Sequence, residues 1–98
     1  MSTLETIRFH LREGVADADF LELNRSVEND YMAKRPGFVA RTTARSADGE
    51  YLVTVHWKTA EDAEATIAAF FGAPETQGFI GAVDVSTVQS GRYELVEH

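Results

Sequence analysis

The chain has 98 residues, a formal net charge of −7 and no cysteine. A chain of this length normally folds as one domain, and we expect residues 1–98 to form a single domain. The acidic charge disfavours binding to nucleic acid or to an anionic membrane surface, and the absence of cysteine excludes disulfides, thiolate catalysis and cysteine metal sites. The N-terminal residues show neither the basic segment nor the apolar run of a secretion signal. No later apolar run is long enough to span a membrane, so we expect a cytoplasmic protein.

An alternating pattern predicts a first strand over residues 6–12, which Gly14 ends. Apolar side chains occupy one face of this strand, and polar or charged side chains occupy the other. The apolar face consists of Ile7, Phe9 and Leu11, and the polar face of Thr6, Arg8, His10 and Arg12.

A helix is predicted next, with Asp17 or Asp19 as its N-cap, because aspartate accepts hydrogen bonds from the free N–H groups of a first turn. Pro36 and Gly37 are expected to end it, since the residue before a proline avoids helical angles. Its apolar residues recur at helical spacing and form one stripe. That stripe comprises Phe20, Leu23, Val27 and Tyr31.

Residues 38–45 and 50–57 are predicted as two strands of a hairpin, with Gly49 at positive φ in the turn. Thr59 is then expected to cap a second helix, with Asp62 three residues later. Residues 72–81 read as irregular, with one short helical turn after Pro74, and residues 82–89 as a fourth strand that residues 92–96 extend or accompany. The buried stripe of the second helix is expected to be Ala63, Ile67, Phe70 and Phe71.

The predicted order is strand, helix, strand, strand, helix, strand. Right-handed crossovers would place both helices on one face of an antiparallel sheet, which is the ferredoxin-like arrangement of the α+β class. The other face of the sheet is then bare. We expect a second copy of the chain to cover it in a homodimer.

Three features carry a resemblance to a known family. Residues 35–38 read Arg-Pro-Gly-Phe before the second strand, residues 56–63 run from a strand-end tryptophan into an alanine-rich helix, and the first strand ends in Arg12-Glu13-Gly14. In these features the chain resembles the antibiotic biosynthesis monooxygenase family of dimeric α/β barrels, over nearly its whole length. The resemblance implies a cofactor-independent monooxygenase that acts on a small electron-rich aromatic of the hydroquinone or anthrone type.

The resemblance also implies a pocket within each subunit, between sheet and helices. Apolar walls with few polar groups suit a flat aromatic ligand, for which Asn24 and Tyr31 could supply hydrogen bonds and Phe9, Trp57 and Phe70 aromatic contacts. The alternative is that these side chains simply fill the core. The walls expected for the pocket are Phe9, Leu11, Leu23, Val27, Val55, Trp57, Ile67 and Phe70.

The opposite sheet face is expected to be polar. His10 and His56 are candidate general bases there, because the pKa of an imidazole lies near neutrality. The arginines of this face could bind an anion, or could pair with Asp84 or Glu94 across a dimer interface. The residues assigned to this face are Arg8, His10, Arg12, Arg41, Thr43, Thr54 and His56.

No metal or organic cofactor is expected. His10 and His56 lack a third ligand at a convincing spacing, and the glycines have no strand–turn–helix context for NAD or FAD. Because one fold hosts many functions, a non-catalytic small-molecule-binding or structural dimer is the competing hypothesis.

Overall fold

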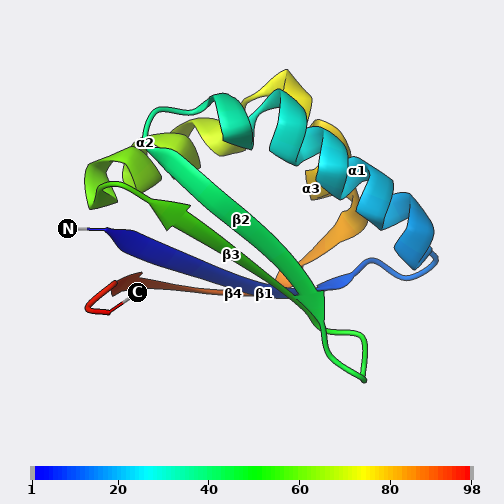
Figure 1. Ribbon diagram of the computed structural model, residues 1–98. Helices are drawn as coiled ribbons and strands as arrows, with labels where there is room; N and C mark the ends of the chain where they lie inside the picture. Colours follow the sequence, from blue (N-terminus) through cyan, green and yellow to red (C-terminus); the bar gives the residue numbers. More distant parts are fainter. Residues whose placement is uncertain (1, 98) are drawn as a thin grey trace.

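The computed structural model describes residues 2–97, which form one antiparallel sheet and one layer of helices (Figure 1). The chain runs β1, α1, β2, β3, α2, α3, β4, and the strands lie in the order β2-β3-β1-β4. This is the expected ferredoxin-like arrangement of two β-α-β halves. The strands are β1 (Thr3–Leu11), β2 (Phe38–Arg45), β3 (Tyr51–Trp57) and β4 (Val83–Glu94).

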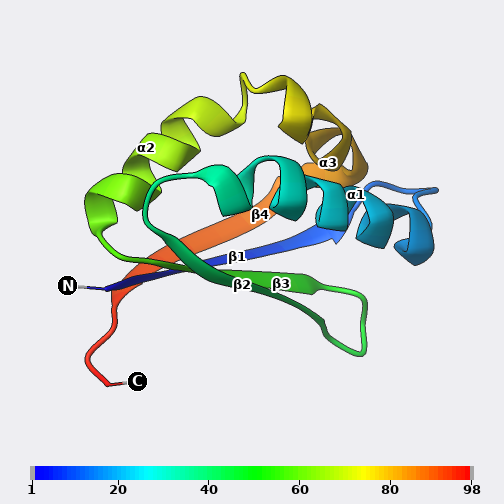
Figure 2. The same cartoon turned by 45° about the horizontal axis from the view of Figure 1, so that its top comes forward.

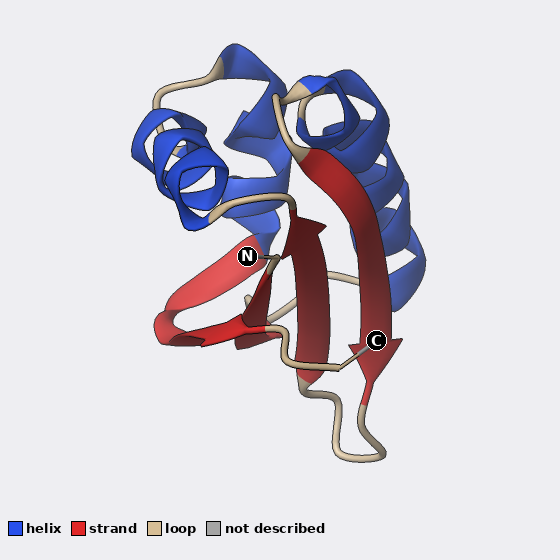
Figure 3. Cartoon of the chain, turned by 60° about the vertical axis from the view of Figure 1, so that its left-hand side comes forward, coloured by secondary structure: helices blue, strands red, loops and turns tan. Residues whose placement is uncertain are grey.

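The helices all lie on one face of the sheet and leave the other face open (Figures 2 and 3). A short α-helix was not expected: α3 follows the 3₁₀ turn at Pro74 and occupies part of the segment that read as irregular. The helices are α1 (Asp17–Asp30), α2 (Ala60–Phe70) and α3 (Gln77–Ala82), with the 3₁₀ helices η1 (Met32–Lys34) and η2 (Pro74–Thr76).

The start of α2 confirms one predicted cap, and the start of α1 corrects another. The backbone N–H of Asp62 donates to Thr59 Oγ1 at 3.1 Å, as a capping threonine requires. Helix α1 instead has Ala16 as its N-cap, with no side-chain cap bond. The prediction of an aspartate cap is therefore wrong, and Asp17 uses its carboxylate on the side chains of Arg45 and Tyr51.

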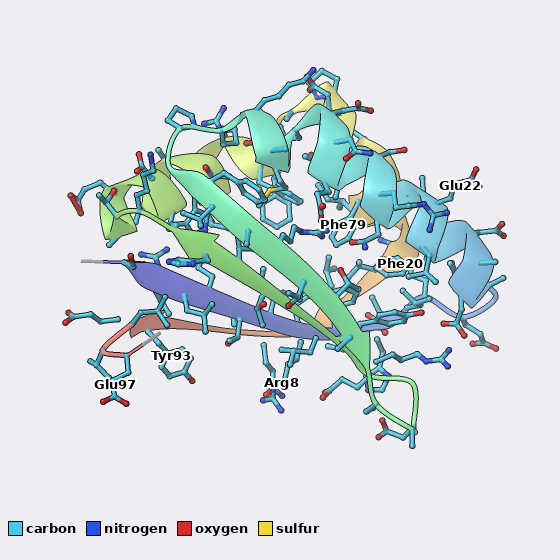
Figure 4. The ribbon with its side chains drawn as sticks, viewed as in Figure 1. Arg8, Phe20, Glu22, Phe79, Tyr93 and Glu97 are labelled. Atoms are coloured by element: carbon cyan, nitrogen blue, oxygen red, sulfur yellow. The ribbon has the colours of Figure 1, made fainter. Side chains whose placement is uncertain are left out.

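Aromatic rings join the helices to the sheet. Phe20 of α1 packs between Phe9 of β1 and Phe79 of α3, with ring centroids 5.7 Å and 5.5 Å away. Phe20, Phe79 and their neighbours pack between the two layers (Figure 4). The α1 stripe is buried as predicted at Phe20, Val27 and Tyr31. In α2, Ala63 is buried as predicted, and Thr66 is buried as well. Ile67 and Phe71, the residue just past the end of α2, are exposed, so their predicted place in the buried stripe is wrong.

A β-bulge near the start of β2 changes which residues of this strand face the helices. Phe38 pairs with Trp57, but Ala40 then pairs with His56, so one extra residue lies between them. Since side chains alternate along a strand, one inserted residue exchanges the two faces for every later position. Arg41 and Thr43 therefore face the helices, and their predicted place on the polar face is wrong.

Candidate active site

A cavity of about 180 Å³ lies between the sheet and the helices. Its floor is the helix-facing side of β1 and β3, and its roof comes from α2, α3 and η1. Phe79, in the roof, points toward the sheet (Figure 4). The lining residues are Ile7, Phe9, Val53 and Val55 in the floor, Met32, Ile67, Phe70, Phe71, Phe79 and Ile80 in the roof, Val83, Val85, Val88 and Ser90 of β4, and the charged residues Glu5 and Arg41.

The cavity opens to solvent between the end of α2 and the edge strand β4. Its lining residues are exposed at this place and buried in the floor, and the exposed fractions reach 64% for Phe71 and 51% for Val85. Ile67 and Val88 complete this apolar rim. An aromatic molecule could therefore enter without displacing the sheet.

The volume of the cavity limits the size of its ligand. An engineered apolar protein cavity of about 150 Å³ binds benzene. The present cavity is slightly larger at about 180 Å³, so it has room for one aromatic ring with small substituents. A three-ring anthrone would have to extend through the mouth.

Two charged residues lie in this largely apolar wall, in one row across the sheet. Arg41 on β2 pairs with Val55 on β3, and Val55 pairs with Glu5 on β1. Neighbouring strands lie about 4.8 Å apart, so the backbones of Arg41 and Glu5 are about 10 Å apart. A cation and a carboxylate thus stand on either side of the cavity floor.

Glu5 is buried and holds a defined position. Its Oε1 accepts a hydrogen bond from Trp57 Nε1 at 2.9 Å, and its Oε2 lies 3.4 Å from Arg92 Nη2. Arg92 also contacts Glu64 Oε1 of α2 at 3.0 Å. The carboxylate is therefore fixed by neighbours on two strands, and Glu5 is part of the cavity wall.

Arg41 is held by α1. Its Nη2 donates to Asn24 Oδ1 at 2.7 Å, its Nη1 lies 3.3 Å from Glu28 Oε1, and its Cζ lies 5.8 Å from the centre of the Phe79 ring. Burial lowers the pKa of Arg41, although Glu28 acts in the opposite direction.

The predicted site residues divide into two groups. Phe9 and Phe70 line the cavity. Asn24, Tyr31 and Trp57 lie behind its wall, where Asn24 bonds Arg41, Trp57 bonds Glu5, and the Tyr31 hydroxyl donates to the carbonyl oxygen of Thr66 at 3.1 Å. These three residues thus contact the wall of the cavity and not its interior. Of the remaining expected walls, Val55 and Ile67 line the cavity, while Leu11, Leu23 and Val27 do not.

The two histidines lie on the other side of the sheet. His56 pairs with Leu4 and Ala40, and His10 pairs with Asp84, all on the open face. Neither histidine lines the cavity. Their role as general bases stays a prediction, and it would require a ligand on the open face.

Sequence reasoning missed Glu5 and Arg41, the charged residues of the cavity wall. Glu5 precedes the predicted start of the first strand, although the alternation of Ile7, Phe9 and Leu11 continues back through Glu5 to Thr3. Arg41 was placed on the wrong face because the bulge leaves no clear mark in the sequence.

Neither a metal site nor a membrane span is evident in the described part of the chain. Residues 2–97 contain no group of three or more His, Asp or Glu side chains arranged to hold a metal ion. None of the helices within these residues combines the length and the apolar character needed to cross a membrane.

Comparison with solved structures identifies proteins that share this fold. The chain is similar to SnoaB, a cofactor-independent oxygenase from Streptomyces nogalater, with a TM-score of 0.79 and 19% identity over 99% of this chain and 95% of that one. A candidate antibiotic biosynthesis monooxygenase from Bordetella bronchiseptica gives a TM-score of 0.79 at 16% identity, with 98% of each chain covered. Rv0793 from Mycobacterium tuberculosis gives 0.71 at 14% identity, covering 100% of this chain and 98% of that one. Neither a protein-family model nor a curated protein sequence matches the chain.

Proposed function

We propose that this protein is a cofactor-independent monooxygenase of the antibiotic biosynthesis monooxygenase family, and that it acts on a one-ring aromatic of the hydroquinone type. The observation that carries the proposal is the open apolar cavity of about 180 Å³ with Glu5 and Arg41 in its wall. The shared fold with SnoaB supports the reaction class. Because a fold alone does not determine a function, the cavity is the stronger argument.

The reaction needs little from the protein. An ionised hydroquinone can pass an electron to dioxygen by itself. Overall, a hydroquinone and one dioxygen give a hydroxyquinone and one water, so that one oxygen atom enters the ring, the other leaves as water, and the substrate supplies all the electrons. The protein has to take the hydroxyl proton, stabilise the anion and exclude water.

The residues of the cavity are suited to these tasks. Phe9, Phe70 and Phe79 provide an apolar aromatic surface for the ring. Glu5 is the carboxylate in the wall and is our candidate for the group that accepts the hydroxyl proton. A positioned base typically contributes about 10²–10⁴-fold to the rate. His10 and His56 remain the competing candidates for this role, from the opposite face of the sheet.

Oxygen uptake tests whether the cavity is the site of the reaction. We would follow dioxygen consumption with hydroquinone for the wild type, for Ile67→Trp, which fills the mouth of the cavity, and for Ala68→Trp. Ala68 is an exposed neighbour on α2 that does not line the cavity. The proposal predicts saturable uptake by the wild type and Ala68→Trp, and loss of uptake in Ile67→Trp. Uptake no faster than a protein-free blank would contradict catalysis.

The same assay separates the candidate bases. Glu5→Gln keeps an oxygen that can accept the Trp57 N–H but removes the charge, and we expect it to lower turnover by about 10²–10⁴-fold. The double variant His10→Ala/His56→Ala should retain turnover. The opposite result would move the reaction to the open face of the sheet.

A specific observation keeps the non-catalytic alternative in view. Glu5 is already engaged by Trp57 and Arg92, so the same cavity could bind an aromatic molecule without turning it over. Saturable binding of hydroquinone with no oxygen uptake would identify a binding protein of the same fold.

The open sheet face supports a homodimer. Its central row consists of the paired residues Thr42, Thr54, Thr6 and Gly91. The flanking rows are Ala40, His56, Leu4 and Tyr93 on one side and Ala44, Leu52, Arg8 and Gln89 on the other. The small side chains of the central row allow two identical sheets to approach closely there. We propose that a second copy of the chain covers this face.

A further inference from the structure

Arg41 is the unusual residue of the cavity wall. Only 3% of its side chain is exposed, and its neighbours along the wall, Val53, Val55 and Phe79, are hydrocarbons. Burying a charge is costly unless its partners compensate for the lost water. The contacts of the guanidinium therefore show whether its charge is already satisfied.

The compensation within the protein is incomplete. The contact from Arg41 Nη1 to Glu28 Oε1 measures 3.3 Å, whereas a strong charge-assisted bond measures about 2.7–2.9 Å. The Glu28 side chain is 40% exposed, so solvent weakens its attraction for the buried cation. Asn24 contributes only a neutral oxygen. The lowered pKa of Arg41 agrees, because burial outweighs the effect of Glu28.

We propose that Arg41 makes the cavity selective for aromatic ligands that carry an anionic oxygen, either a carboxylate or an ionised phenol. The inference rests on the proposed function for its site and ligand class, and it adds the charge of the ligand. The ring would lie against Phe70 and Phe79, with its oxygen at the guanidinium. A guanidinium has more N–H donors than the contacts to Asn24 and Glu28 use.

A pair of matched ligands tests this selectivity in the wild type. Benzoate and benzyl alcohol have the same ring, but only benzoate is charged. We expect calorimetric titration to show tighter binding of benzoate by about 10- to 100-fold, the range for a hydrogen bond to a charged group. A parallel titration with 4-nitrophenol, above and below its pKa, shows whether an ionised phenol is accepted as well. Equal binding of the charged and neutral forms in both experiments would overturn the proposal.

Arginine variants assign the preference to one residue. Arg41→Met should lose the preference for benzoate, while Arg45→Met should keep it. Arg45 is on the same strand and the same face as Arg41, but it pairs with Asp17 and does not line the cavity. Loss of the preference in both variants, or in neither, would contradict a specific role for Arg41.

Glu28→Gln provides a test that does not remove the cation. If Glu28 competes with the ligand for Arg41, its neutralisation should tighten benzoate binding several-fold and leave benzyl alcohol unchanged. Weaker or unchanged benzoate binding would mean that Arg41 serves only to hold α1. These titrations measure binding alone, so a failed oxygen-uptake assay and a failed anion preference are separate results.

Discussion

Glu5 and Arg41 are charged residues buried in the cavity wall, at positions where a charge lowers the stability of the fold. Transferring an ion from water into a protein costs several kcal/mol even after relaxation, and well-packed apolar residues are often more stabilising. Glu5 offsets this cost with the Trp57 N–H and Arg92, and Arg41 does so less fully with Asn24 and Glu28. A chain that needed only a core would gain stability from apolar residues at both positions. The two charges therefore support a ligand site in the cavity.

Tyr51 shows a different kind of buried polar group. Its ring is 2% exposed and packs on Phe20, with a centroid distance of 4.6 Å, while its hydroxyl donates to Asp17 Oδ1. Burial, followed by the hydrogen bond to Asp17 and the negative charge of that residue, raises the pKa of Tyr51. The folded state thus holds the hydroxyl proton more tightly than the unfolded chain does.

This difference predicts a pH effect on stability. The contribution of Tyr51 is complete below the pKa of an unfolded tyrosine, about 10, and is lost as the pH rises through the higher folded value. Tyr51→Phe should cost about 1 kcal/mol at neutral pH and should reduce the alkaline fall in stability, measured by urea unfolding. Tyr93→Phe, which removes an exposed tyrosine of β4, should keep the full slope. An unchanged slope in Tyr51→Phe would contradict the account.

At the scale of elements, the connection from α1 to β2 packs against the start of α2. Gly37 adopts a φ of +80°, a conformation that glycine reaches without strain, and its carbonyl oxygen accepts from Lys58 N at 2.8 Å. A Cβ at Gly37 would lie 2.0 Å from Asp62 Oδ2. Asp62 in turn accepts from Thr59 Oγ1 at 2.9 Å within the cap of α2.

Two glycine substitutions separate backbone strain from this contact. Gly37→Ala and Gly49→Ala both place a side chain at positive φ, which costs about 1–3 kcal/mol, but a Cβ at Gly49 meets nothing within 4 Å. Gly37→Ala should lower the free energy of unfolding by about 1–3 kcal/mol more than Gly49→Ala does, because Asp62 has to move out of its cap. Chemical denaturation measures both. Equal losses would show that the contact with Asp62 has no energetic weight.

The elements differ in how well their sequences predicted them. The alternation of β3 and the turn residue Gly49 were sufficient to predict this strand and its hairpin. The structure shows period-two burial along the whole of Tyr51–Trp57 and a φ of +94° at Gly49. The bulge in β2 was not predictable, because its extra residue, Val39, has the same β-branched character as an ordinary strand residue. This one insertion moved Arg41 from the open face into the cavity wall.

At the scale of the whole molecule, the two faces of the sheet have different tasks. The helices cover one face and enclose the cavity, while Arg8 and Tyr93 point away from them on the other (Figure 4). Small polar and apolar residues dominate the centre of that open face, and Leu4 and Leu52 are half-buried within the single chain. The proposed homodimer would bury them completely.

A charge beside the central row of the open face should disrupt such a dimer. We expect Leu52→Asp to shift the protein from dimer to monomer in sedimentation velocity, because the interface would bury a charge where the wild type has a leucine. Leu21→Asp makes the same change at an exposed position of α1 and should remain dimeric. A monomeric wild type would contradict the dimer and leave the cavity argument intact.

The fold was more predictable than the site. Strand order, the hairpin and the single helical layer follow from periodicity and turn residues, which act locally or through general rules of connection. The cavity depends on how side chains from β1, β2 and α3 meet, and these contacts are set by register and not by composition. The sequence identified Phe9 and Phe70 because aromatic side chains in an apolar stripe or strand face are expected to be buried. Glu5 and Arg41 could be placed in the cavity wall only once the strand register was known.

The central claim is that the cavity on the helix side of the sheet binds an aromatic ligand. The most direct measurement is a methyl ¹H–¹³C NMR titration with hydroquinone under anaerobic conditions. The account predicts saturable shifts of the Val53, Val55 and Ile67 methyls, which line the cavity, and unchanged methyls of Leu4 and Leu52 on the open face. Shifts confined to Leu4 and Leu52 would place the ligand beside His10 and His56 and contradict the account.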